Sequence, residues 1–195
     1  MRALMRPAAL AAAALAITGC ATTAQGPSGG SGAAAVAERS VLVTVPPAGR
    51  GAPFDLSGEA LDGGRLSLAA YRGKVVVLNF WASWCGECRG EADDLAAAAR
   101  GTAAQGVQFV GVDTRELQRS APRVFVRTHH LDYPNFFDTD GDLMLKVPAR
   151  YLDPMGGIPF TLVLDRRGRI AARAWTPLTA DQLTALVAPL AAERG

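Results

Sequence analysis

The fold is decided by the stretch Val75-Val76-Val77-Leu78-Asn79-Phe80, which is followed at once by Trp81-Ala82-Ser83-Trp84-Cys85-Gly86-Glu87-Cys88-Arg89. The first six residues are too few to span a membrane and too continuously apolar for a strand with one wet face. They therefore predict a strand that is buried on both faces of a parallel sheet. The residues from Glu91 to Ala99 are good helix formers. The two cysteines are thus predicted to lie where a buried strand turns into a helix.

A Cys-x-x-Cys pair at such a junction predicts redox chemistry. The unpaired N–H groups and the macrodipole of a helix N-terminus stabilise the thiolate of the first cysteine. The spacing places both sulfurs on one side of the first turn, within reach of a disulfide. We expect Cys85 to be the exposed nucleophile and Cys88 the resolving thiol. A structural disulfide or half of a zinc site is the alternative, but only His129 and His130 remain as further imidazole ligands.

The segment from Phe80 to Arg89 resembles the active-site segment of thioredoxin-fold proteins. With Asn79 before it and Glu91 three residues after the second cysteine, it resembles the TlpA/ResA-like thiol–disulfide oxidoreductases. The resemblance covers residues 52–192 and implies an α/β thioredoxin fold, in which helices flank a central mixed β-sheet and a β-hairpin extends the N-terminus. It also implies exchange with protein thiols and disulfides outside the cytoplasmic membrane, a membrane redox partner, and no metal or organic cofactor.

The resemblance also assigns residues around the cysteines. Pro159 matches the proline of a cis-proline loop that faces the disulfide, whereas only about 5–6% of X–Pro bonds are cis in general. A trans proline that opens an edge strand is the alternative. Glu91 matches an acid that handles protons near the buried sulfur, and the alternative is a first-turn glutamate stabilised by the helix dipole. Asn79 stands where cytoplasmic thioredoxins carry a buried aspartate, and it cannot exchange protons.

Trp84, Gly86 and Glu87 complete the predicted active-site loop. Trp84, like Trp81, is expected to pack at the core or rim rather than to take part in catalysis. Glu87 stands where proline is common in the family, and its carboxylate disfavours a second negative charge on Cys85. A higher pKa of Cys85 would favour the disulfide and make the pair a stronger reductant. We therefore favour a reductant, which would serve cytochrome c maturation or other secreted proteins, over an oxidant that forms disulfides.

The first 20 residues are predicted to be a lipoprotein signal peptide. A basic start is followed by a short apolar stretch, and Ile17-Thr18-Gly19-Cys20 resembles a lipobox, in which Cys20 would carry the lipid that anchors the protein to the extracytoplasmic face of the bacterial membrane. An ordinary signal peptide is the alternative, although lipidation would also account for the third cysteine. Residues 21–51 contain much Gly, Ser and Pro and are predicted to be a flexible linker. The thioredoxin-like domain is then expected to span residues 52–195.

The remaining pattern alternates strands and helices, as an α/β domain requires. Gly63-Gly64 predicts the turn of the hairpin, and Thr179 with Gln182 predicts a capping box at the start of the last helix. Residues 41–45 have the composition of a short strand, although they fall inside the predicted linker. Strands are predicted at 107–112, 134–137, 161–165 and 170–175, and a helical stretch over 115–130 that Pro122 interrupts.

Charge and motif patterns argue against other functions. The net charge of +2 gives no reason to expect nucleic acid as a partner. A thiol peroxidase would need Pro-x-x-x-Thr-x-x-Cys, but Leu78 and Ala82 occupy those places before Cys85. A copper-delivery protein of this fold would be expected to carry Cys-x-x-x-Cys and a distant histidine, and a structural lipoprotein without redox activity would be expected to have lost one cysteine.

Overall fold

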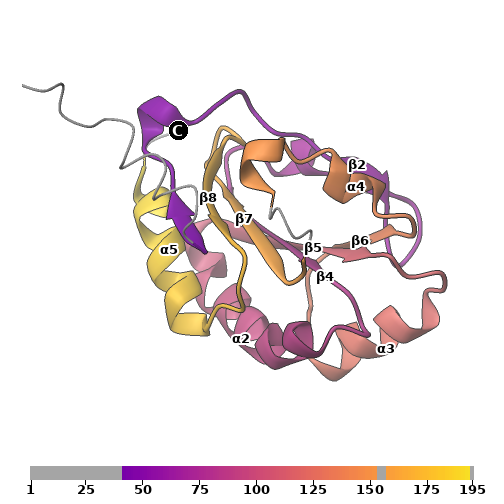
Figure 1. The fold of residues 1–195 in the computed structure, drawn as a ribbon. Helices are drawn as coiled ribbons and strands as arrows, with labels where there is room; N and C mark the ends of the chain where they lie inside the picture. The colour runs from indigo at the N-terminus through magenta and orange to yellow at the C-terminus, as the bar shows by residue number, and fades with distance from the viewer. Residues whose placement is uncertain (1–40, 153–156, 194–195) are drawn as a thin grey trace, which may run out of the picture.

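The centre of the fold is a six-stranded mixed sheet with the strand order β1-β8-β7-β4-β5-β6 (Figure 1). The structure is a computed structural model that describes residues 41–152 and 157–193. Strand β4 (Val75–Trp81) runs parallel to β5 (Val107–Thr114) and antiparallel to β7 (Phe160–Leu164). The predicted mixed sheet of the thioredoxin fold is therefore confirmed.

The outer strands complete this sheet on both sides. Strand β6 (Asn135–Asp138) pairs parallel with β5, while β8 (Ile170–Ala174) pairs antiparallel with β7. The predicted hairpin is a separate two-stranded sheet of β2 (Ser57–Glu59) and β3 (Arg65–Ser67). Gly63–Gly64 form part of its five-residue turn with positive φ angles of 101° and 78°, a conformation that side chains rarely adopt.

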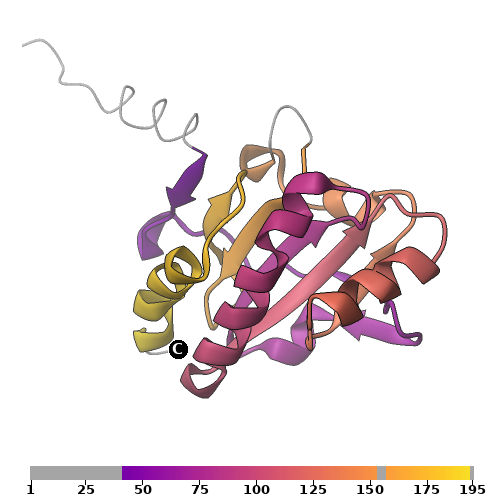
Figure 2. The same ribbon diagram turned by 90° about the horizontal axis from the view of Figure 1, so that it is seen from below.

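Both faces of the sheet are covered by apolar layers. Every residue of β4 is buried, which confirms the prediction of a strand with two dry faces. Three helices cover one face, namely α2 (Gly86–Thr102), α3 (Ser120–Thr128) and α5 (Ala180–Ala192) (Figure 2). The other face is covered by the segment around the hairpin and by the short helix α4 (Asp142–Leu145). The active-site helix is therefore held on its inner side by a continuous hydrophobic core.

The helix after β5 is shorter than predicted. It begins at Ser120, so Pro122 lies in its first turn, where a missing N–H costs no intrahelical hydrogen bond. The expectation of a helix interrupted by this proline was therefore wrong. Residues 115–119 form a loop instead, and Arg115 in this loop has a positive φ of 58°.

The predicted capping box of α5 is confirmed. The Thr179 hydroxyl accepts the Gln182 backbone N–H, and the Gln182 side chain accepts the Thr179 backbone N–H. A local pattern of this kind depends only on residues three positions apart, which is why it could be identified from the sequence.

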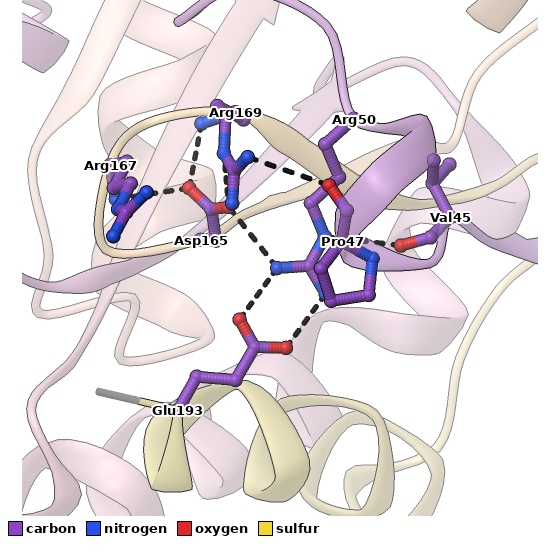
Figure 3. Close-up of polar contacts among 7 residues, drawn as sticks. All are labelled: Val45, Pro47, Arg50, Asp165, Arg167, Arg169 and Glu193. Atoms are coloured by element: carbon purple, nitrogen blue, oxygen red, sulfur yellow. Dashed lines mark hydrogen bonds and ion pairs between the residues drawn. The ribbon is translucent and has the colours of Figure 1, made fainter. Parts of the chain in front are cut away.

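The segment 41–51 packs on the domain, although it was predicted to belong to the linker. Strand β1 (Leu42–Thr44) pairs antiparallel with β8, and a 3₁₀ turn at Pro47–Gly49 leads to Arg50. The buried Arg50 guanidinium contacts Asp165 at 3.1 Å and both carboxylate oxygens of Glu193 at 2.6 and 2.7 Å (Figure 3). The ordered part of the domain thus extends back beyond Ala52, because its edge strand pairs with residues about 130 positions later.

The predicted signal peptide, the lipidation site Cys20 and residues 21–40 of the predicted linker lie outside the described residues. Within the described ranges, none of the helices combines the length and the apolar character that a membrane span requires.

Candidate active site

Cys85 and Cys88 form a disulfide at the start of α2. The sulfurs are 2.13 Å apart and the Cα atoms 5.3 Å apart. Cys85 is the N-cap residue of the helix, and its sulfur accepts the Cys88 backbone N–H at 3.1 Å. The strand–helix junction therefore places the first sulfur directly at the helix N-terminus, where an N–H donor and the macrodipole favour a thiolate.

The two cysteines differ less in exposure than the sequence suggested. The exposed fraction is 7% for Cys85 and 1% for Cys88. The expectation that Cys85 would be exposed is thus wrong in degree, although it is the more accessible of the two. Part of the reason is the loop before β7, whose Ile158 carbonyl oxygen lies 3.7 Å from the Cys85 sulfur.

This loop carries a cis peptide bond between Ile158 and Pro159. Pro159 itself is buried. Because the carbonyl before the proline faces the Cys85 sulfur, the loop forms one wall of the site. The alternative of a trans proline at this position is excluded.

Glu91 is buried one turn after Cys88. One carboxylate oxygen accepts the Asn79 side-chain N–H at 2.8 Å, and the other accepts the Leu178 backbone N–H at 3.2 Å. Burial raises the pKa of Glu91 to about 7, although these two donors oppose the shift. A carboxyl group with this pKa can take up or release a proton near neutral pH. A first-turn glutamate stabilised by the helix dipole, which was the alternative interpretation, would instead have its ionised form favoured and its pKa lowered.

Asn79 joins the site to the middle of the sheet. Its amide also donates to the Thr161 hydroxyl on β7 at 3.0 Å, while its carbonyl oxygen has no hydrogen-bond partner among the described residues. Asn79 therefore fixes the position of Glu91 without being able to exchange a proton itself.

The two tryptophans have different environments. Trp81 is buried, stacks on Phe125 at a centroid distance of 4.5 Å, and donates to Asn135 at 3.1 Å. Trp84 is 54% exposed beside the disulfide, and its indole N–H donates to the Arg115 carbonyl at 3.3 Å. Their predicted roles in the core and at the rim agree with these positions.

Gly86 and Glu87 form the exposed first turn of α2 between the cysteines. A Cβ atom on Gly86 would meet no atom within 4 Å, so packing does not require glycine there. The Glu87 carboxylate lies in the first helical turn, where it interacts favourably with the same N-terminal dipole that favours the Cys85 thiolate.

Two acidic residues near the site were missed in the sequence. Glu116 is 93% buried, and its carboxylate accepts the Ser83 backbone N–H at 2.5 Å. Asp113 is fully buried, and neither of its oxygens has a hydrogen-bond partner among the described residues. Burial raises the pKa of Asp113 to about 8, and repulsion from Glu116 and Asp138 adds to the shift. The available signal was that Asp113 directly follows the predicted strand 107–112, because the carboxyl ends of parallel strands line the functional edge of α/β sheets.

Within the part of the chain that the structure describes, no three or more His, Cys, Asp or Glu side chains gather in a way that could hold a metal ion. The site consists of the Cys85–Cys88 disulfide, the N-terminus of α2, the loop with the cis bond before Pro159, and the buried Glu91. Together these groups are equipped for thiol–disulfide chemistry.

Fold and site define a thioredoxin-fold protein with a Cys-x-x-Cys disulfide at the start of its active-site helix. The chain belongs to the AhpC/TSA family, whose model matches residues 48–173.

Two curated relatives indicate the branch within this family. The thiol:disulfide interchange protein HelX of Rhodobacter capsulatus is 34% identical over 121 residues, which cover 62% of each chain. The thiol-disulfide oxidoreductase ResA of Bacillus subtilis is 30% identical over 112 residues, which cover 57% of this chain and 59% of ResA. The chain thus spans about three fifths of the length of these relatives.

Solved structures cover more of the domain. A secreted thiol-disulfide isomerase from Corynebacterium glutamicum superposes with a TM-score of 0.70 at 30% identity, over 80% of this chain and 94% of the other. A DsbF homologue from Corynebacterium diphtheriae gives a TM-score of 0.67 at 29% identity, over 76% and 92% of the two chains.

Proposed function

We propose that this protein is a thiol–disulfide oxidoreductase that exchanges disulfides with protein substrates outside the cytoplasmic membrane. The observation that carries the proposal is the Cys85–Cys88 disulfide, which caps α2 and faces the Ile158–Pro159 loop. Relatives named thiol:disulfide interchange protein and thiol-disulfide oxidoreductase support the same chemistry.

As a reductant, the dithiol form acts in two steps. The Cys85 thiolate attacks a substrate disulfide, so a mixed disulfide forms and one substrate thiolate leaves. The Cys88 thiolate then attacks the Cys85 sulfur, which releases the second substrate thiolate and closes the Cys85–Cys88 disulfide. Two electrons pass to the substrate. Glu91 accepts the proton that Cys88 must lose before it attacks, since its pKa of about 7 suits a general base near neutral pH.

The surface beside the disulfide supports a protein substrate. Trp84, Leu117 and Val124 are large apolar side chains that remain exposed. A groove of about 570 Å³ runs between the start of α2 and α3, and Ser83, Val124 and Phe125 are among its lining residues. Exposed apolar side chains beside a reactive group are suited to contact another polypeptide.

We further propose that Cys20 is lipidated and anchors the domain at the extracytoplasmic face, where a membrane redox partner supplies the electrons. The lipobox pattern supports this anchor, and relatives and neighbours described as secreted support the compartment. Replacing Cys20 with Ser should release the protein from membranes and leave disulfide exchange by the purified protein unchanged. Membrane retention of the variant would contradict the anchor.

The deciding experiment measures the reduction potential and the activity of the Cys85–Cys88 pair. We expect a potential near or below about −270 mV, the value of thioredoxin, and not near the −120 mV of the oxidant DsbA. The Cys88→Ser variant should trap a mixed disulfide through Cys85, whereas Cys85→Ser should abolish exchange. A potential near −120 mV would make the protein an oxidant. Reduction of hydrogen peroxide without exchange on protein disulfides would favour a peroxidase and contradict the proposal.

A further inference from the structure

The residues before Cys85 are held by a loop from a different part of the chain. Glu116, in the loop between β5 and α3, accepts the Ser83 backbone N–H at 2.5 Å, and its side chain is almost fully buried. Ser83 lies two positions before the helix cap, so its N–H has no partner within α2 itself. The carboxylate of Glu116 therefore supplies the hydrogen bond that this turn of backbone needs.

The adjacent residue of the same loop holds Trp84. The indole N–H of Trp84 donates to the Arg115 carbonyl at 3.3 Å, and the Arg115 guanidinium lies 6.0 Å from the indole centroid. Arg115 has a φ of 58°, a left-handed conformation that is uncommon for a residue with a side chain. Its own N–H donates to the Asp138 carbonyl at 2.8 Å at the end of β6. The sheet thus supports the loop, and the loop supports Ser83 and Trp84.

These contacts matter most when the disulfide is open. In the oxidised protein the bond to Cys88 helps to fix the position of Cys85. Reduction removes that bond, whereas the contacts of Glu116 and Arg115 do not involve either sulfur. We propose that Glu116 is a positioning residue, which holds the Ser83–Trp84 backbone so that the reduced Cys85 stays at the N-terminus of α2. This inference rests on the proposed thiol–disulfide exchange.

Position and charge act on Cys85 in opposite directions. Holding Cys85 at the helix N-terminus favours its thiolate, whereas the negative charge of Glu116 disfavours it. Asp113 on β5 interacts electrostatically with Glu116, Asp138 and Arg119. Two further cations lie at this turn, because Arg89 donates to the Ser83 carbonyl at 3.2 Å and the Arg115 guanidinium lies beside Trp84. The two effects change the Cys85 pKa in opposite directions. A substitution that removes only the charge of Glu116 should therefore lower this pKa, and one that removes only the hydrogen bond should raise it.

The test uses the full chain with three substitutions of Glu116, each reduced and alkylated with iodoacetamide over a range of pH. Glu116→Gln keeps an acceptor oxygen for Ser83 and removes the charge. Glu116→Asp keeps the charge and shortens the reach, and Glu116→Ala removes both. We expect Ala and Asp to lower the alkylation rate of the Cys85 thiolate and the kcat/KM of exchange about tenfold, since small misplacements of reacting groups are costly. Gln should restore most of both rates and lower the Cys85 pKa.

The control is Asp62→Asn, which removes an exposed carboxylate in the hairpin turn and should leave the thiolate rate and the Cys85 pKa at their original values. If Glu116→Ala does not fold, Trp84→Phe takes its place in the test. This variant removes the indole donor to the Arg115 carbonyl and should reduce the alkylation rate of the Cys85 thiolate by less than tenfold. Equal thiolate rates for all Glu116 variants and the unmodified protein would overturn the proposal, and so would an effect of Gln equal to that of Ala. A lack of exchange by the unmodified protein would instead contradict the proposed function.

Discussion

Two buried carboxyl groups near the disulfide have different surroundings. Glu91 accepts two hydrogen bonds, from Asn79 and from the Leu178 backbone, whereas Asp113 has no hydrogen-bond partner in the described ranges. An unpaired buried carboxylate is costly, so Asp113 avoids the cost by keeping its proton. The two residues should therefore respond differently to substitution by their neutral amides.

Replacing Asp113 with Asn should stabilise the protein at alkaline pH. The unfolded chain loses this proton near pH 3.8, whereas the folded protein keeps it to about pH 8. The folded state therefore binds more protons between these values, and stability falls as the pH rises. Asp113→Asn removes this loss, which amounts to an increase in unfolding free energy on the order of 5 kcal/mol at pH 8.

Urea unfolding from pH 5 to 9 measures the effect of this substitution. The variant should lose stability less steeply with pH than the unmodified protein. Asp132→Asn changes an exposed carboxylate and serves as the control, with no expected change in slope. Identical slopes for Asp113→Asn and the unmodified protein would show that Asp113 does not hold its proton in the fold.

Replacing Glu91 with Gln should change the pH dependence of exchange. With a pKa of about 7, Glu91 becomes able to accept the Cys88 proton as the pH rises through neutrality. The rate of closing the mixed disulfide should therefore rise through pH 7 in the unmodified protein, and this limb should disappear in Glu91→Gln. The amide oxygen can accept only one of the two bonds, from Asn79 or from Leu178, because the amide nitrogen is a donor, so unfolding of Glu91→Gln is measured alongside its rate.

Stopped-flow measurement of mixed-disulfide resolution between pH 5.5 and 8.5 tests this role. Asp93→Asn, which neutralises an exposed carboxylate two positions further along α2, is the matched control. Were Glu91→Gln to keep the original profile, Glu91 would serve only to hold Asn79 and the loop at Leu178.

At the scale of single residues, the sequence showed what is local. Cys85, Cys88 and Glu91 lie within seven positions of one another, and the resemblance supplied Pro159. Glu116 could not be assigned in this way, because its partner Ser83 is 33 positions earlier and the contact exists only after β4 and β5 have paired.

At the scale of the elements, two arginines hold the hairpin against the helix layer. Arg119 is the N-cap residue of α3, and Arg123 lies in its second turn. Arg119 donates to the carbonyls of Ala60 and Leu61, at 2.5 and 3.0 Å, and its guanidinium lies 4.3 Å from the centroid of the Phe137 ring. Arg123 donates to Leu61 at 3.0 Å, and its Nε lies 3.8 Å from the exposed Asp62 carboxylate. The hairpin, too small to be stable alone, is thereby tied to the helix layer.

Removal of Arg119 should therefore cost more stability than removal of Arg123. We expect Arg119→Ala to lower the free energy of unfolding by about 2 kcal/mol, because the carbonyls of the half-buried Ala60 and the buried Leu61 lose a charged donor. Arg123→Ala should cost less than about 1 kcal/mol, since Leu61 keeps its contact with Arg119. Urea unfolding compares the two variants with Arg127→Ala, an exposed arginine one turn further on. Equal losses at the two positions would contradict this division.

The elements that the sequence predicted poorly are those defined by distant partners. The buried strand β4 and the last helix follow from local composition, and both were identified. The composition of residues 41–45 indicated the short strand β1, but its place at the edge of the sheet comes from pairing with β8 and could not be predicted. The same holds for the start of α3, where the loop at Arg115 is set by contacts with the ends of other elements.

At the scale of the whole molecule, the first described segment and the residue after α5 meet through Arg50 and Glu193. Strand β1 runs antiparallel to β8, with Leu42 level with Ala174 and, across β7, with Thr161 and Asn79. The chain therefore enters the fold at the end of the sheet where β4 leads to the disulfide (Figure 2). After β1, Arg50 links the N-terminal segment to Asp165, in the turn that follows β7, and to Glu193, the residue after α5 (Figure 3).

Replacing Arg50 with Ala should destabilise the fold and make it less sensitive to acid. Burial alone would raise the pKa of Asp165, but the Arg169 backbone N–H and the guanidinium groups of Arg50 and Arg169 together hold it below its usual value of 3.8. Asp165 is thus an ionised partner of Arg50 throughout the neutral range. Removing Arg50 leaves Asp165 with Arg169 as its remaining guanidinium and takes away the hydrogen-bonded cation of Glu193, so Arg50→Ala should cost about 3 kcal/mol of unfolding free energy at pH 7.

The pH dependence follows from the direction of the shift. A depressed pKa of Asp165 adds stability that is present above pH 3.8 and is lost as the pH falls through the lower value in the folded protein. The difference in unfolding free energy between the unmodified protein and Arg50→Ala should therefore shrink below about pH 4. Arg50→Lys keeps a charge but cannot bridge Asp165 and both Glu193 oxygens with one planar group. Its unfolding free energy should therefore lie between those of the unmodified protein and Arg50→Ala. A loss that stays the same at pH 7 and pH 3 would mean that Arg50 stabilises the fold through packing and not through its carboxylate partners.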